Sequence, residues 1–221
     1  MRSRRILVTS VAVVFVAAGC GGRNGTSKVG VISTVVGGGQ GGDGGPATSA
    51  LLANPDAVTC DSHKNLYVVD QGFANVRKVN RKGTITTVAG TAGGSSLFSG
   101  DGGPATTAKL NGPLSIALDP TGNLYIADSG NNRIRRVDNK GVITTVVGNG
   151  EAGFSGDGGP AAAAKLADPE AIAFDAAGNL YIDDYNNSRI RRVDRKGIIK
   201  TVAGTGEAGF SGDGAPRPRP N

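Results

Sequence analysis

The feature that most constrains this chain is a motif that returns at a nearly fixed interval. The string Gly-Asp-Gly-Gly-Pro-Ala places its aspartates at Asp43, Asp101 and Asp157, and a variant follows at Asp213, so the steps are 58, 56 and 56 residues. The segment Asn-Leu-Tyr begins at Asn65, Asn123 and Asn179, with steps of 58 and 56 residues. Because two independent markers keep one register, the chain is a series of structural repeats.

Each repeat contains four short stretches in which the residue pattern has a period of two. In the second repeat they cover residues 115–119, 123–128, 133–138 and 142–147. The first repeat has matching stretches at 56–61, 65–70, 76–80 and 84–89. The third repeat has them at 171–175, 179–184, 189–194 and 198–203. This period predicts β-strands. Four antiparallel strands joined by tight turns and repeated at a fixed spacing predict the blade of a β-propeller.

Residues 30–36 resemble the fourth strand of a repeat but precede the first complete one. The predicted fold is therefore all-β: a β-propeller of three complete four-stranded blades plus one extra N-terminal strand, in an open or incomplete ring. Closing a ring generally takes at least four blades. Two explanations stay open: a homodimer that completes a six-bladed ring, or a truncated copy of a longer propeller.

The N-terminus has the features of an export signal. A basic start is followed by an apolar run from Ile6 to Ala18, too short for a membrane-spanning helix, and then by Gly19 and Cys20. A cysteine directly after small residues resembles a bacterial lipobox, which implies lipid attachment at Cys20. The predicted organisation is a signal peptide over 1–19, a flexible tether over 20–29, the propeller over 30–214 and a Pro/Arg tail over 215–221.

The positive charge of the chain lies mostly at its two ends. The formal net charge is +6, but five of the 24 Lys and Arg residues stand at positions 2, 4, 5, 217 and 219. The remaining 19 face 18 Asp and Glu, so the repeats themselves are near neutral. A strong field toward nucleic acid or membrane is not expected, and the lipid is the predicted contact with the membrane.

The stretch Asn123 to Val137 (NLYIADSGNNRIRRV) and its counterparts Asn65 to Val79 and Asn179 to Val193 look like NHL repeats. Gly153 to Ala161 (GFSGDGGPA) resembles the long-blade NHL proteins of bacteria. The resemblance implies the propeller fold. Proteins with such repeats include extracellular sensor domains, teneurin-like cell-surface propellers, RNA-binding modules and an amidating lyase. Because their functions differ, the function of this chain has to be argued from its site.

Long loops precede each blade, over residues 37–55, 90–113 and 148–169, and should open on the same face as the ends of the second strands. Pro46, Pro104 and Pro160 suit the first position of a short helical turn. An acidic rim with spaced phenylalanines is predicted on this face, able to hold a cation such as Ca²⁺, a sugar or a peptide. Its candidate residues are Asp70, Asp128, Asp184, Asp43, Asp101, Asp157, Phe98 and Phe154. The alternative is ordinary Asp-Gly turn chemistry, in which the carboxylates cap backbone N–H groups.

The third strands of two repeats carry basic clusters: Arg133, Arg135 and Arg136 in the second repeat, and Arg189, Arg191 and Arg192 in the third. Their spacing favours solvent-exposed arginines on an outer strand, which protect a sheet edge. A phosphate-binding role is the alternative interpretation.

Motifs of catalysis are absent from the sequence: it contains no HExxH, CxxC or GxSxG segment and no spaced calcium loop. The single histidine, His63, falls in a turn on the face opposite the predicted rim. We therefore predict no catalytic residues and no required cofactor. The expected function is a lipid-anchored, extracytoplasmic scaffold that binds a protein, peptide or glycan; the alternative is a propeller-type lyase or lactone hydrolase dependent on a divalent cation.

Overall fold

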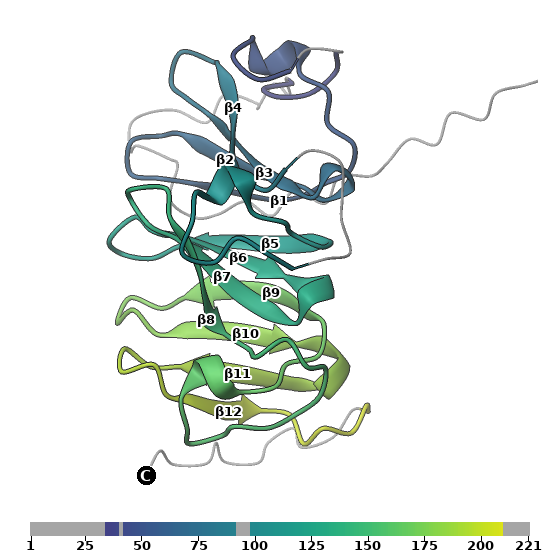
Figure 1. Cartoon of the computed structure of the whole chain (residues 1–221), viewed down its shortest axis with the longest axis vertical. Helices are drawn as coiled ribbons and strands as arrows, with labels where there is room; N and C mark the ends of the chain where they lie inside the picture. Colours follow the sequence, from purple (N-terminus) through teal and green to yellow (C-terminus); the bar gives the residue numbers. More distant parts are fainter. Residues whose placement is uncertain (1–33, 40–41, 92–97, 210–221) are drawn as a thin grey trace, which may run out of the picture.

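A computed structural model describes residues 34–39, 42–91 and 98–209, and places three four-stranded antiparallel sheets one after another along the molecule (Figure 1). Blade 1 contains β1 (Pro55–Cys60), β2 (Leu66–Asp70), β3 (Asn75–Val79) and β4 (Ile85–Ala89). Blade 2 contains β5 (Pro113–Leu118), β6 (Leu124–Asp128), β7 (Arg133–Val137) and β8 (Ile143–Val147). Blade 3 contains β9 (Pro169–Phe174), β10 (Leu180–Asp184), β11 (Arg189–Val193) and β12 (Ile199–Ala203). Every predicted strand of the three blades is confirmed.

The strands of each blade are hydrogen-bonded in sequence order, as a simple meander. The first strands of neighbouring blades pack together, β1 against β5 and β5 against β9. The fourth strands β4, β8 and β12 form the opposite edges of the sheets. This is the arrangement of propeller blades around an axis, and the described residues do not close into a ring.

The hydrophobic core lies between the blades rather than within a single sheet. Val69 and Val76 of blade 1 share one cluster with Ile116 and Ile126 of blade 2. A second cluster joins blades 2 and 3 in the same way. Each blade therefore needs a neighbour on both sides to bury its two faces.

The long loops connect neighbouring blades. Their short helical turns are η1 (Ala47–Ser49), η3 (Ala105–Thr107) and η5 (Ala161–Ala163), and the proline that was predicted at the first position of each turn stands one residue earlier, at the N-cap. A residue directly after the outer strand of the preceding blade donates a hydrogen bond to this turn. Between blades 2 and 3, the Gly148 N–H donates to the Ala161 carbonyl at 3.0 Å. The same loop pairs with the outer strand of its own blade, where Gly158 N–H donates to the Ile199 carbonyl at 2.7 Å.

The glycine that follows each outer strand cannot be replaced without strain. Gly148 has a φ of +87°, and a Cβ added there would lie 2.4 Å from the carbonyl oxygen of Asn132. Only glycine combines this backbone conformation with so close an approach. The loop can therefore leave the outer strand directly toward the next blade.

Blades 1 and 3 each expose a face that neighbouring blades cover elsewhere. Val58 of β1 is 37% exposed, whereas the equivalent Ile116 and Ile172 are 6% and 8% exposed. On β12, Val202 is 39% exposed and Ala203 is exposed too, while the residue equivalent to Ala203 in blade 2, Val147, is 1% exposed. The two end blades thus present the same surfaces that form the interior interfaces.

The predicted N-terminal strand over 30–36 lies mostly outside the described residues, and its described part, 34–36, has no strand pairing. Gly37 N–H nevertheless donates to the Ala47 carbonyl at 2.9 Å, as Gly90 and Gly148 do directly after outer strands. This contact is the one that the glycine after an outer strand makes with the helical turn of the following blade. The predicted signal peptide, the tether with Cys20 and the Pro/Arg tail lie outside the described residues.

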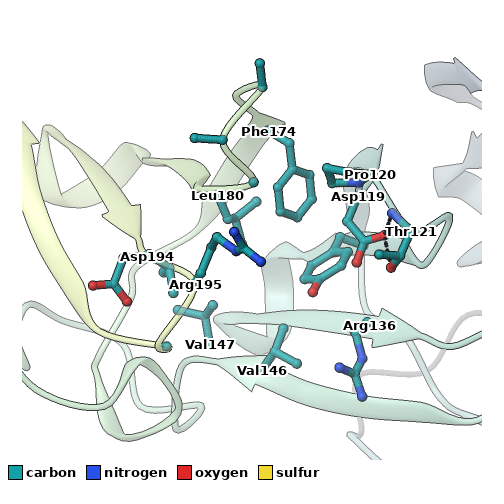
Figure 2. A pocket seen from close by; sticks show the side chains of 16 residues that line it. Asp119, Pro120, Thr121, Arg136, Val146, Val147, Phe174, Leu180, Asp194 and Arg195 are labelled. Carbon is teal, nitrogen blue, oxygen red and sulfur yellow. Dashed lines mark hydrogen bonds between the residues drawn. The ribbon is translucent and has the colours of Figure 1, made fainter.

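We call the side with the long loops and the ends of the second strands the long-loop face. The hairpin turns after the first and third strands lie on the opposite side, the turn face. There, a cleft of about 580 Å³ opens between blades 2 and 3 (Figure 2).

Candidate functional site

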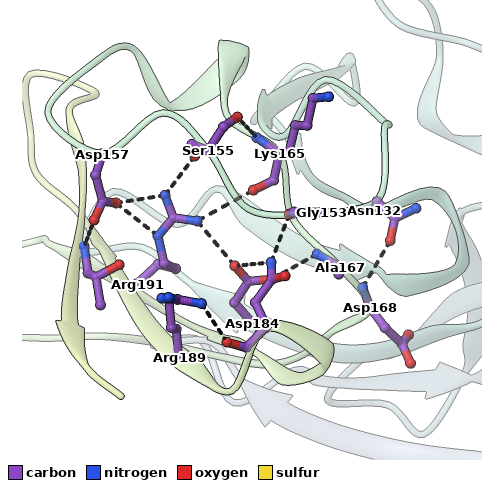
Figure 3. A network of polar contacts seen from close by, with 12 residues as sticks. Asn132, Gly153, Ser155, Asp157, Lys165, Ala167, Asp168, Asp184, Arg189 and Arg191 are labelled. Atoms are coloured by element: carbon purple, nitrogen blue, oxygen red, sulfur yellow. Dashed lines mark hydrogen bonds and ion pairs between the residues drawn. The ribbon is translucent and has the colours of Figure 1, made fainter. Parts of the chain in front are cut away.

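A buried arginine at the centre of each third strand organises the long-loop face. In blade 3, Arg191 is fully buried, and its Nη1 lies 3.1 Å from Oδ2 of Asp184. Its Nη2 and Nε donate to Oδ1 of Asp157 at 2.8 and 3.1 Å (Figure 3). The guanidinium thus joins a carboxylate from its own sheet to a carboxylate from the long loop. We call this arrangement the Asp–Arg–Asp bridge.

Blade 2 repeats the bridge with the same geometry. Arg135 is fully buried, 3.2 Å from Asp128 and 2.7 Å from Asp101. Asp128 also accepts hydrogen bonds from the backbone N–H of Asn111 at 2.8 Å and from the side-chain amide of Asn131 at 2.9 Å. A buried ion pair is stable only when the remaining donors and acceptors are satisfied in this way.

The prediction of exposed arginines is wrong for Arg135 and Arg191, the central residues of the third strands in blades 2 and 3. Arg77 is 5% exposed, and Arg135 and Arg191 are completely buried. The reason is that two aspartates enclose each guanidinium, or one in blade 1, which makes burial of the charge possible. A signal was present in the sequence, because the loop aspartate precedes this arginine by 34 residues in every blade.

The predicted acidic rim also needs correction. Asp70, Asp128 and Asp184 are 0% exposed, because they accept hydrogen bonds from the loop that covers them, and so they do not lie on an accessible surface. The side chains of Asp43, Asp101 and Asp157 are 45%, 37% and 38% exposed, but each is paired with an arginine. These six residues thus have a structural role, as the alternative expected, but most of their partners come from distant segments rather than from their own turns.

The two predicted phenylalanines lie over the bridges. The ring of Phe98 lies 3.9 Å from the Arg133 guanidinium carbon and 4.5 Å from that of Arg135. Phe154 covers Arg189 and Arg191 at 3.8 and 4.8 Å and keeps 41% of its surface exposed. Two cation–π contacts thus hold each ring, and Phe154 still has 41% of its surface exposed.

Blade 1 carries an incomplete version of the bridge. Arg77 pairs with Asp43 at 2.6 Å, and Asp70 accepts the Ala53 and Asn54 backbone N–H groups instead of the guanidinium. Oδ2 of Asp70 and Nε of Arg77 are buried without a hydrogen-bond partner. In blades 2 and 3, the side-chain amides of Asn131 and Asn187 donate to the aspartates equivalent to Asp70. Phe73 occupies this position in blade 1, so Asp70 lacks the amide donor.

The pKa values of these carboxyls follow from their surroundings. Burial would raise the pKa of Asp157, but the hydrogen bonds from Thr201 and the charge of Arg191 lower it below the usual value. At Asp128 burial outweighs its donors and raises the pKa. Carboxylates paired with guanidinium groups are poor ligands for a divalent cation, and the part of the chain that the structure describes holds no group of three or more His, Cys, Asp or Glu side chains that suits a metal.

Two exposed apolar residues on this face escaped the sequence prediction. Tyr185 is 54% exposed in η6 (Tyr185–Asn187), directly after Asp184, and Leu51 is 40% exposed in the first long loop. The loop that carries Phe154 contacts η6, since Asn187 donates to the Gly153 carbonyl at 2.8 Å. Gln71 and Ser129 occupy the positions equivalent to Tyr185, so the repeat pattern contained no signal for it.

The turn face carries the cleft between blades 2 and 3, lined among others by Tyr125, Phe174, Arg136 and Arg195. The sequence prediction placed the candidate ligand-binding residues on the long-loop face only and included none of the residues that line this cleft. His63 is exposed in a turn of the same face in blade 1, as expected. Among the described residues, no helix is long and apolar enough to cross a membrane.

Four-stranded blades in series, with the NHL-like segment forming the second and third strands, define the protein as an NHL-repeat β-propeller with an open ring. A family model of the teneurin NHL domain matches residues 26–98, 93–155 and 150–212. The chain belongs to this family.

Individual relatives agree with this assignment. Mouse Teneurin-3 is 33% identical over 177 residues, which cover 74% of this chain and 6% of that protein. The chloroplastic protein Suppressor of Quenching 1 of Arabidopsis thaliana is 29% identical over 162 residues, 69% of this chain and 15% of that protein. The chain thus spans a small part of the curated relatives it matches.

Among solved structures, an auxiliary nutrient binding protein from Bacteroides thetaiotaomicron superposes with a TM-score of 0.52 at 22% identity. The match covers 65% of this chain and 36% of that one. It supports the propeller fold.

Proposed function

We propose that the protein is an exported, lipid-anchored and non-catalytic binding module that presents its long-loop face to a protein, peptide or glycan. The observation that carries the proposal is the pair Phe154 and Tyr185, 41% and 54% exposed on blade 3, where the Asp–Arg–Asp bridge fixes the loop beneath. Exposed aromatic side chains on a rigid base are favourable binding groups, because little side-chain entropy is lost on contact.

The partner is an uncharged or weakly charged surface. The aspartates of this face are neutralised by arginines, so it offers aromatic and hydrogen-bonding contacts rather than a strong electrostatic field. Glycans and peptides both suit such a surface, since sugar rings and apolar side chains pack on Tyr and Phe.

Binding arrays of glycans and peptides test this proposal. The mature chain is compared with Phe154→Ala and Tyr185→Ala, and with His63→Ala as a control on the turn face. We expect at least a tenfold loss of affinity in the first two variants and none in the control. Ligands that bind both long-loop variants as tightly as the wild type would place the binding surface elsewhere.

The proposal includes no metal and no reaction. A divalent-cation lyase or lactonase needs carboxylates that face an open site, whereas each aspartate of blades 2 and 3 that was a candidate ligand faces a guanidinium. We expect the melting temperature to be the same with Ca²⁺ and with a chelator. A rise that depends on Ca²⁺ concentration would support the enzymatic alternative, because a ligand of the native state stabilises it.

The proposed anchor is the lipid on Cys20. Membrane fractionation of cells should find the wild type with the membranes and Cys20→Ser in the soluble exported fraction. Thioether lipidation and a disulfide with Cys60, the other cysteine in the sequence, exclude each other, because both use the same sulfur. Mass spectrometry that finds Cys20 without lipid in the mature protein would contradict the anchor.

The proposal extends to assembly: two chains complete a six-bladed ring. The exposed Val58 face of blade 1 and the exposed Val202 face of blade 3 are the two halves of the interface found between blades 1 and 2 and between blades 2 and 3. Two identical head-to-tail contacts close a pair of three-blade chains, with no exposed blade face left.

A further inference from the structure

The cleft between blades 2 and 3 combines apolar walls with two arginine side chains. It has a volume of about 580 Å³, within the range of small-molecule sites. The rings of Tyr125 and Phe174 meet edge to face, with centroids 4.8 Å apart and planes at 77°. Val146, Val147 and Leu180 complete the apolar wall (Figure 2).

The two carboxylates of the cleft are already used by their own turns. Asp119 accepts hydrogen bonds from the backbone and side chain of both Thr121 and Asn123, at 2.8 to 2.9 Å. Although burial acts in the opposite direction, these bonds lower the pKa of Asp119. Asp194 accepts the backbone N–H groups of Lys196 and Ile198 at 2.8 and 3.0 Å.

The two guanidinium groups of the cleft keep unused donors. Nε of Arg136 is buried and has no hydrogen-bond partner. Arg195 is exposed at the mouth, with its aliphatic part near Gly178, and forms no hydrogen bond or ion pair with another described residue. Figure 2 shows its side chain extending across the cleft between Phe174 and Val147. The two aspartates and two arginines of the lining balance in formal charge, so what favours an anion here is the unpaired guanidinium of Arg195 rather than a net charge.

We propose that this cleft binds a small carboxylate with an apolar or aromatic body: the carboxylate pairs with Arg195, and the body packs on Tyr125 and Phe174. Arginine donors in a fork geometry match a carboxylate, and low polarity around them strengthens the pairing. This site lies on the turn face and is independent of the proposed long-loop surface.

The interface between blades 1 and 2 provides an internal comparison. Its equivalent positions hold Leu118 in place of Phe174, Asn139 in place of Arg195 and Lys78 in place of Arg136. The common blade architecture therefore does not require the second aromatic ring or the two arginines. They are specific to the cleft between blades 2 and 3.

The test is an NMR titration of the mature protein with N-acetylphenylalanine, and with N-acetylphenylalanine amide as the uncharged probe of equal shape. The acid should shift signals of the turns 119–122, 176–178 and 194–197, and should bind at least five times more tightly than the amide. Signals of Phe154 and Tyr185 should stay in place, so this result is separate from that for the long-loop face.

Variants identify the groups that bind. Arg195→Asn installs the residue of blade 2 and should weaken binding of the acid at least fivefold, because Arg195 is exposed and its replacement leaves the fold intact. Arg81→Asn changes the equivalent exposed turn of blade 1, where no blade lies opposite, and should have no effect. Equal affinity for acid and amide, shifts absent from these turns, or equal weakening by both variants would each overturn the proposal.

Discussion

Arg191 shows how a strongly charged side chain becomes part of a blade interior. It has no exposed surface, and it contacts Asp157, Asp184 and two backbone carbonyls. The desolvation cost of a guanidinium is offset only when most of its five N–H donors have acceptors. The bridges therefore fix the geometry of the long-loop face.

Replacing this arginine should destabilise the protein strongly. In Arg191→Leu, Asp184 keeps its buried place but loses its cation, and such changes cost about 3–5 kcal/mol. Urea unfolding measures the loss. Lys140→Gln, in an exposed turn, is the control and should change the free energy of unfolding by less than about 0.5 kcal/mol. An equally small effect in both variants would contradict the structural role of the bridge.

The lowered pKa of Asp157 predicts how its contribution depends on pH. A carboxyl with a depressed folded-state pKa stabilises the fold fully above its unfolded pKa of about 4 and loses the effect as pH falls through the folded value. Asp157→Asn should thus be less stable than wild type at pH 7, and the gap should narrow below about pH 4.

Asp183 is the control of opposite sign for this prediction. Burial, with Asp184 nearby, raises its pKa, so its ionised form disfavours the fold at neutral pH. Asp183→Asn should be at least as stable as wild type at pH 7, and this difference should disappear as pH falls. Parallel pH profiles for the two variants would show that the assigned causes are wrong.

The central arginines mark the limit of sequence reasoning at this scale. A strand pattern with a period of two predicts that polar side chains point to solvent. Arg135 is polar and is nevertheless completely buried. Its burial depends on Asp101, 34 residues earlier; the constant spacing is visible in the sequence, but only the folded loop shows that it marks a contact. The same partner explains why the aspartates did not form the predicted rim.

At the scale of the elements, hairpins were predictable and loop docking was not. All twelve strands of the three blades lie within two residues of their predicted positions, because their turns depend on local glycine and asparagine residues. The pairing of Gly158 with Ile199 joins segments far apart in the sequence and has no local signal. That pairing is what carries the loop aspartate to the arginine.

Blade 1 offers a prediction that repairs an incomplete element. Phe73→Asn supplies the amide donor that Asn131 and Asn187 provide in the other blades, so Oδ2 of Asp70 gains a partner. Satisfying a buried acceptor should raise the free energy of unfolding by about 1 kcal/mol. The reverse change, Asn131→Phe in blade 2, should lower it by at least as much.

Both variants are compared by denaturant unfolding at constant m-value, so that only stability differs. A decrease in stability for Phe73→Asn would show that the packing of Phe73 outweighs the missing hydrogen bond.

At the scale of the whole molecule, the repeat itself predicts an interface. Blades 2 and 3 bury Ile116 and Ile172 against the preceding blade, and blade 1 exposes the equivalent Val58. In a repeat protein each unit contacts only its neighbours, so an exposed end face has the composition of an interior interface. The number of repeats was evident from the sequence. Which face of each end blade is left uncovered could be seen only in the packed structure.

Light scattering of the purified mature protein is the most direct test of this account of the open blades. We predict a species of twice the mass of one mature chain, and single chains for Val202→Asp, which places a charge in the contact without touching the bridges. Wild-type protein that stays a single chain at all concentrations tested would contradict the six-bladed assembly.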